Sequence, residues 1–130
     1  MLRHREGRLN MDFRQPLGKV AYHAACHQRV QNIGRKTEEI LKMVPGTTVH
    51  TNERCSGHAG TYGVKVATHK TAMKIGKPVF KNMAKDEPDL ISSDCPMAGH
   101  HIAQGMTEAG TPPKALQHPL ALVRMAYGLE

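Results

Sequence analysis

The sequence predicts a small three-layer α/β domain with a Rossmann-like parallel sheet of three to four strands. Short runs rich in apolar and β-branched residues, at residues 19–23, 47–50 and 89–93, are typical of buried strands. Helical patterns alternate with these runs, in the order β-α-β-α-β-α with a closing C-terminal helix, which implies a parallel sheet with right-handed crossovers. A chain of 130 residues is long enough for one hydrophobic core and too short for two.

The first half of the chain is divided by Gly and Pro. Residues 1–18 mix charge, Gly and Pro without a period, so we interpret them as a linker or partly ordered arm before a single domain at residues 19–130. The pattern at 35–44 predicts a helix with Ile40, Leu41 and Val44 on one stripe, which Pro45-Gly46 ends.

The second half begins with the longest helical pattern, at residues 64–85. Gly76 and Pro78 interrupt it, so we expect either a kinked helix or two shorter helices that meet there. Cys95-Pro96 is expected to open the next helix, and His118-Pro119 the last one. The residues expected to face inward are Val64, Ala67, Thr71, Ile75, Val79 and Met83 in the long helix, Ala98, Ile102 and Met106 in the next, and Leu120, Val123, Ala126 and Tyr127 in the last.

Composition excludes several classes of protein. No apolar stretch is long enough to span a bilayer and the N-terminus lacks the apolar segment of a signal peptide, so we expect a cytoplasmic protein, with peripheral membrane association left open. The net charge is +7, but the basic residues are spread at roughly helical intervals without interleaved aromatic residues. We therefore expect no nucleic-acid partner, and a basic surface that is either solvated or docks an acidic protein.

Each of the three cysteines follows one predicted strand and precedes one predicted helix. Cys26 follows V-A-Y-H-A-A, Cys55 follows T-T-V-H-T-N-E-R, and Cys95 follows D-L-I-S-S-D. The carboxyl ends of parallel strands open on one crevice, so three thiols distant in sequence are expected to meet there as metal ligands. Two other interpretations remain: small buried residues without a function, or a thiol enzyme in which Cys26 or Cys55 is a nucleophile paired with a histidine.

A glycine-rich loop surrounds Cys55. Gly57, Gly60 and Gly63 lie within seven residues, and backbone amides in such a loop are able to point at a bound anionic group. Three thiolates leave a fourth ligand open, for which His58 is the first candidate. The further candidates are His23, His27, His100 and His101.

The string E-R-C-S-G-H-A-G-T-Y-G, with Y-H-A-A-C-H before it and S-S-D-C-P-M-A-G after it, resembles the cysteine-rich CCG domain. This domain occurs in iron–sulfur oxidoreductases of the heterodisulfide reductase and anaerobic glycerol-3-phosphate dehydrogenase type. Its lone Cys, Cys-Cys-Gly and Cys-x-x-Cys motifs bind an iron–sulfur cluster. By resemblance these motifs correspond to Cys26, to Cys55-Ser56-Gly57, and to the segment from Cys95 to Ala98, so Ser56 and Ala98 replace two of five thiols.

The resemblance implies an iron–sulfur-binding electron-transfer domain, with a 4Fe-4S cluster and no catalytic residue of its own. The expected metal ligands are Cys26, Cys55, Cys95 and His58, and Ser56, Gly57 and Gly60 are expected to contact the cofactor. Family members usually carry two such halves, so we expect a redox protein partner or an N-terminal half supplied elsewhere. The alternative is a zinc-binding or metal-free structural module of a redox complex, since three Cys and one His are ordinary zinc ligands.

Overall fold

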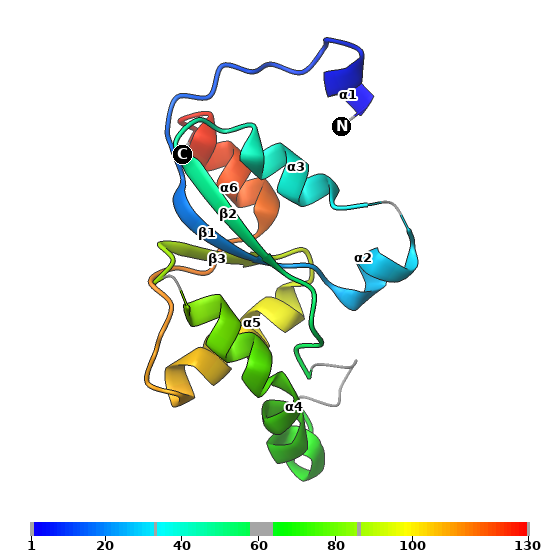
Figure 1. Cartoon of the computed structure of the whole chain (residues 1–130), viewed down its shortest axis with the longest axis vertical. Coiled ribbons are helices and arrows are strands. Elements are labelled where there is room, and N and C mark those ends of the chain that lie inside the picture. The colour runs from blue at the N-terminus through cyan, green and yellow to red at the C-terminus, as the bar shows by residue number, and fades with distance from the viewer. Residues whose placement is uncertain (1, 33, 58–63, 86, 130) are drawn as a thin grey trace.

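A computed structural model describes residues 2–32, 34–57, 64–85 and 87–129 as an open three-stranded parallel sheet covered by helices on both faces (Figure 1). The α/β fold and the three-layer arrangement predicted from the sequence are confirmed. In chain order the elements are α1 (Leu2–Arg5), β1 (Gly18–His23), α2 (Cys26–Val30), α3 (Lys36–Lys42), β2 (Thr47–Asn52), α4 (Val66–Ala84), β3 (Leu90–Ser93), α5 (Pro96–Glu108) and α6 (Pro119–Ala126).

The strand order is β2-β1-β3, so the first strand lies in the middle of the sheet. Val20 pairs with Val49 on one side and with Leu90 on the other, and both pairings are parallel. Beyond β3, a single parallel bridge joins Ile91 to Leu116 on the return from α5. Three strands and one bridge agree with the predicted three to four.

Alternate residues of the strands supply two separate cores. Val20 and Leu90 pack with α3 and α6 on one face, where Leu41 and Leu122 are fully buried. On the opposite face the neighbouring strand residues pack with α4 and α5; this second core consists of Ala21, Val79, Phe80, Met83, Ile91, Ile102 and Met106. The period of two along each strand is what separates the two sets.

Two details of the long helix differ from the prediction. α4 is one continuous helix with Pro78 inside it, so the two-helix alternative is wrong. Of the residues expected to face inward, Val79 and Met83 are buried, whereas Val64, Ala67, Thr71 and Ile75 are not. The buried set is Ala72, Gly76, Val79, Phe80 and Met83. The predicted stripe was rotated because it counted small and β-branched residues at its start and omitted Phe80.

The last two helices follow the prediction more closely. The expected face of α5, which contains Ala98, Ile102 and Met106, is buried. In α6 Ala126 is buried as expected, but Leu120 is 73% exposed and Leu122 occupies the core instead. Near the N-terminus, Phe13 stacks on Tyr127 with ring centroids 4.8 Å apart.

Candidate functional site

The three cysteines lie beyond the carboxyl ends of three adjacent strands. His23 ends the central strand and pairs with Asn52 of β2 and Ser93 of β3, so the three strands end level with one another. Cys26 begins α2 after β1, Cys55 follows β2, and Cys95 is the N-cap of α5 after β3. The three thiols therefore stand at the same edge of the sheet.

The thiols differ in exposure. Cys26 and Cys55 are exposed, Cys95 is partly buried, and all three are free thiols. Cys95 also stands at the N-terminus of a 13-residue helix, where the helix dipole favours negative charge. Arg29 and Arg54 line a cavity together with Cys55, which adds positive charge beside that thiol. This edge of the sheet is thus suited to a group that carries negative charge.

His23 links the three segments that carry the cysteines. Its ring is 1% exposed, and Nε2 lies 2.9 Å from the carbonyl oxygen of Arg54, directly before Cys55. A carbonyl only accepts, so Nε2 carries the proton and Nδ1 accepts from the Ser93 hydroxyl at 3.3 Å. The Ser93 oxygen in turn accepts from the backbone N–H of Cys95 at 3.3 Å. One neutral imidazole at the end of β1 therefore holds the approaches to Cys55 and Cys95.

Burial lowers the pKa of His23 below its ordinary value, and the nearby charge of Arg29 lowers it further, while the Arg54 carbonyl and Asp94 oppose the shift without cancelling it. The neutral ring is the form that the hydrogen bonds require. Both ring nitrogens already have protein partners, so His23 would have to break one of these hydrogen bonds to bind a metal. Its linking role was not predicted, although a histidine at the end of a buried strand was the available signal.

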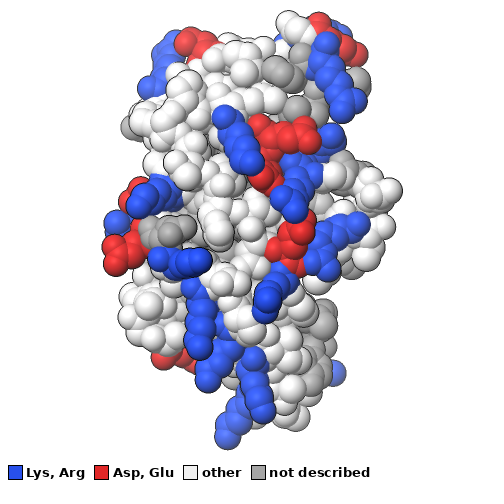
Figure 2. Space-filling model, in the orientation of Figure 1, with Lys and Arg blue, Asp and Glu red and all other residues white. Residues whose placement is uncertain are grey.

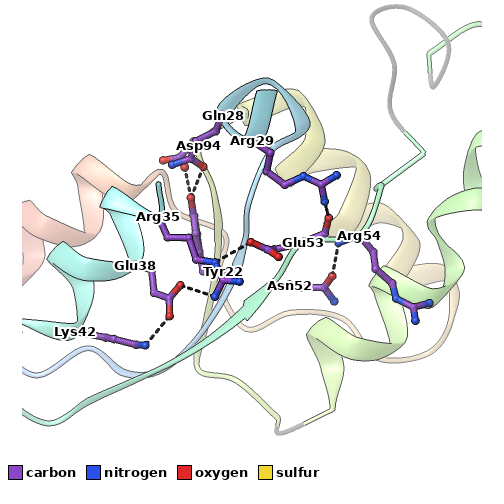
Figure 3. A network of polar contacts seen from close by, with 10 residues as sticks. All are labelled: Tyr22, Gln28, Arg29, Arg35, Glu38, Lys42, Asn52, Glu53, Arg54 and Asp94. Carbon is purple, nitrogen blue, oxygen red and sulfur yellow. Dashed lines mark hydrogen bonds and ion pairs between the residues drawn. The ribbon is translucent and has the colours of Figure 1, made fainter. Parts of the chain in front are cut away.

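A second buried contact anchors the segment before Cys95. The Tyr22 hydroxyl donates to the Asp94 carboxylate, which also accepts from the Thr37 hydroxyl at 2.8 Å (Figure 3). Tyr22 is fully buried, and burial together with the adjacent carboxylate raises its pKa well above the ordinary value. These hydrogen bonds tie the end of β3 to the central strand and to α3.

An ion-pair network lies on the other side, around the segment before Cys55. Arg35 Nε contacts the Glu53 carboxylate at 2.7 Å, and Arg29 donates to the Glu53 carbonyl oxygen (Figure 3). The same Arg35 contacts Glu38, whose carboxylate also pairs with Lys42 at 2.5 Å. Most of these side chains are half-exposed, so each pair contributes little to stability. The network instead fixes α2 and α3 against the strand that leads to Cys55.

The residues after Cys55 pack closely on α4. The Gly57 N–H donates to Cys55 Sγ at 3.4 Å, which confirms that an amide of this loop points at sulfur. Gly57 has φ +83°, and a Cβ there would lie 2.1 Å from the carbonyl oxygen of Ala72. A Cβ on Gly76 would lie 2.3 Å from the Ser56 carbonyl oxygen, and Ser56 itself is 3% exposed. Two glycines thus allow the loop and helix backbones to approach.

The other histidines considered as ligands are placed as follows. His101 is buried between α4 and α5 with its ring 5.7 Å from that of Phe80, whereas His100 is exposed on α5. His58, Gly60 and the side chain of His27 lie outside the described residues. Within the described ranges, no three His, Cys, Asp or Glu side chains are grouped closely enough to hold a metal ion. The ligand set remains a prediction.

A domain with thiols at the carboxyl edge of a small parallel sheet fits one known class. Residues 20–103 match the family of the CCG cysteine-rich domain, and the chain belongs to this family. It is also similar to a named subunit of anaerobic glycerol-3-phosphate dehydrogenase from Escherichia coli, with 32% identity over 109 residues in both strain K12 and strain O157:H7. The alignment covers 83% of this chain and 26% of each relative, so the chain spans about a quarter of the curated relatives it matches.

Proposed function

We propose that this chain is an iron–sulfur-binding electron-transfer domain, a part or subunit of a heterodisulfide-reductase-like oxidoreductase. The observation that carries the proposal is the placement of Cys26, Cys55 and Cys95 at the level ends of three adjacent parallel strands. Membership of the CCG family supports it, as does the similarity to part of a dehydrogenase. A 4Fe-4S cluster bound here would supply one-electron transfer.

The residues around the thiols have supporting roles in this proposal. Thiolate sulfur is the preferred ligand of iron–sulfur clusters, and the three cysteines would provide it, with His58 as the fourth ligand. The Gly57 amide donates to Cys55 Sγ, and hydrogen bonds to ligand sulfur are among the factors that set cluster potential. His23 positions the segments before Cys55 and Cys95 through Arg54 and Ser93. Ser56 and Gly60 are proposed to contact the cofactor.

The rest of the protein is proposed to be supplied by association. Because the chain covers 26% of its relatives, we propose a redox partner or an N-terminal half that completes the site, with residues 19–130 as one domain after an arm at 1–18. Among the helices in the described ranges, none is both long and apolar enough to cross a membrane. Three free thiols fit a reducing compartment, and we propose the cytoplasm, with peripheral membrane association as an option.

Anaerobic purification followed by iron, sulfide and zinc quantitation tests the proposal. We expect iron and sulfide with visible absorption in the wild type, and a loss of most of both in Cys55→Ser and Cys26→Ser. Met97→Ser is the matched control, because it removes an exposed sulfur beside Cys95 that is not a thiol. His58→Ala tests the fourth ligand through a shifted spectrum.

The possible outcomes separate the candidate functions. Colourless protein with one zinc per chain would replace the cluster with a structural zinc site, for which Cys and His are also ordinary ligands. Protein that binds neither metal, before and after anaerobic reconstitution, would reject both sites and leave a structural module. Unchanged metal content in either cysteine variant would show that the shared site is wrong.

A further inference from the structure

Four lysines form a single stripe along α4. Lys70, Lys74, Lys77 and Lys81 follow one another at spacings of four, three and four residues, and all four are exposed. At 3.6 residues per turn this spacing keeps them on one side, opposite the buried face that contains Gly76 and Met83. Figure 2 shows the blue side chains gathered over α4. We call these four residues the lysine stripe.

The lysine stripe differs from other charged surface because it is not neutralised. Helix α4 contains no Asp or Glu in its 19 residues. Within the described ranges, no ammonium group of the stripe has a carboxylate within 4 Å, whereas Lys42 and Lys114 are paired with carboxylates. Glu108 of α5 is the acidic residue in the groove beside the stripe, and Gln104 contacts it at 3.1 Å. A row of unpaired positive charge produces a field that extends into solvent.

The stripe also lies beside the cysteine edge. The cavity that contains Cys55 is lined on its α4 side by Ile75 and Pro78, which alternate along the helix with Lys74 and Lys77. On its other side the cavity is lined by Arg29 and Arg54, so positive charge lies on both sides of the Cys55 thiol. A molecule that binds the stripe would therefore be adjacent to Cys55.

The chemistry of the stripe favours an acidic protein over other anions. Lysine is a hydrated point charge without the planar fork that suits bidentate phosphate contacts, and the stripe contains no Arg. The aromatic residue of α4, Phe80, is 4% exposed and so unable to stack on a base. The apolar face of α4 is buried in the domain core, so the helix has no such face to insert into a bilayer. Flexible surface charges that steer without dehydrating suit the weak encounters of electron-transfer proteins.

We propose that the lysine stripe is the docking surface for the acidic face of a redox protein, and that docking places this partner beside Cys55. The redox character of the partner rests on the proposed function above, while its acidic character rests on the stripe alone. Docking of this kind is weak, is faster at low salt, and depends on the stripe charges more than on the net charge of the domain.

The test compares two variants with the same net charge. Lys74→Gln/Lys77→Gln/Lys81→Gln removes three charges from the stripe. The matched control removes three exposed arginines outside α4: Arg3→Gln/Arg5→Gln/Arg124→Gln. Binding to two small acidic electron carriers, a flavodoxin and a plant-type ferredoxin, is measured by biolayer interferometry in 20 and 200 mM NaCl, after circular dichroism has shown that both variants fold.

We expect the wild type and the control to bind within about twofold of each other, and the stripe variant to bind about tenfold or more weakly at low salt, since each exposed ion pair contributes a factor of two to five. Binding of the wild type should fall steeply at 200 mM NaCl. Equal losses in the two variants, or no binding of either acidic carrier at 20 mM NaCl, would overturn the proposal. So would tighter binding to phosphatidylglycerol vesicles or to a 20-base-pair DNA duplex. Metal content plays no part in this readout, so failure of the cluster proposal is distinguishable.

Discussion

Replacement of His23 tests whether one buried imidazole holds the cysteine segments. In His23→Ala, the Arg54 carbonyl oxygen and the Ser93 hydroxyl lose their ring partner. Each lost hydrogen bond costs about 1 kcal/mol net, and more if the partner left behind stays dry. The space left by a ring that is 1% exposed adds a cavity cost, so we expect about 3 kcal/mol of destabilisation in total.

Urea unfolding at pH 7.5, followed by circular dichroism, measures this loss on the metal-free full chain. His100→Ala is the control, because His100 is exposed on a helix and its loss should change the unfolding free energy by less than about 0.5 kcal/mol. His23→Gln retains an amide that reaches one of the two partners, so it should be intermediate. A loss below about 1 kcal/mol in His23→Ala would refute the linking role.

The pH dependence provides an independent check with a definite sign. The folded-state pKa of His23 is lowered by burial, so the unfolded chain takes up the proton first as the pH falls through about 6.5. The wild type therefore loses stability from the unfolded pKa down to the lower folded pKa, and the alanine variant lacks this contribution. The difference in unfolding free energy between wild type and His23→Ala should shrink from pH 7.5 to pH 5. A constant or growing difference would mean that the ring is not held in its neutral form.

Two further predictions use pairs of variants that differ in one physical respect. Gly57→Ala should destabilise by about 3 kcal/mol or more, because a Cβ would meet the Ala72 carbonyl oxygen at 2.1 Å, whereas Gly110→Ala, at φ +80° with nothing within 4 Å, should cost about 1 kcal/mol; similar thermal unfolding of the two would argue against close packing of the loop. Tyr22→Phe should cost about 1.5 to 3 kcal/mol in urea unfolding, since the hydroxyl binds a carboxylate in a buried position, and Tyr127→Phe, which loses an exposed hydrogen bond to the Asn10 carbonyl, should cost less than half as much; equal losses would contradict the buried anchor.

The sequence was sufficient to predict the layers of the fold and the elements that carry the cysteines. Strand and helix periods identified β1, β2 and β3, and the parallel order followed from the alternation with helices. The position of each thiol at a strand end needed no more than this. The buried face of α4 was harder, because Ala72 and Gly76 are small residues that become buried only where the loop of Ser56 covers them. Local hydrophobicity does not contain that information.

The contacts between the cysteine segments could not be predicted for the same reason. His23 is separated from its partners Arg54 and Ser93 by 31 and 70 residues, and no local pattern joins them. The histidine was therefore grouped with metal-ligand candidates, and its burial and partners define its structural role. The lysine stripe was visible in the sequence as regular spacing, but its lack of neutralising carboxylates depends on which residues α5 places nearby.

The two positions that depart from the five-thiol pattern share one property with consequences for the site. Ser56 is 3% exposed and Ala98 is 5% exposed, whereas Cys26 and Cys55 are exposed. The missing thiols thus belong to the buried side of the loops, where small residues preserve packing against α4 and α5, and the thiols that remain point outward. A cofactor held by outward thiols lies close to the surface, where a short electron-transfer distance to a docked protein requires no channel through the domain. This geometry links the retained cysteines to the lysine stripe beside Cys55: the charges bring the partner to the same side of the molecule on which the sulfur ligands are exposed.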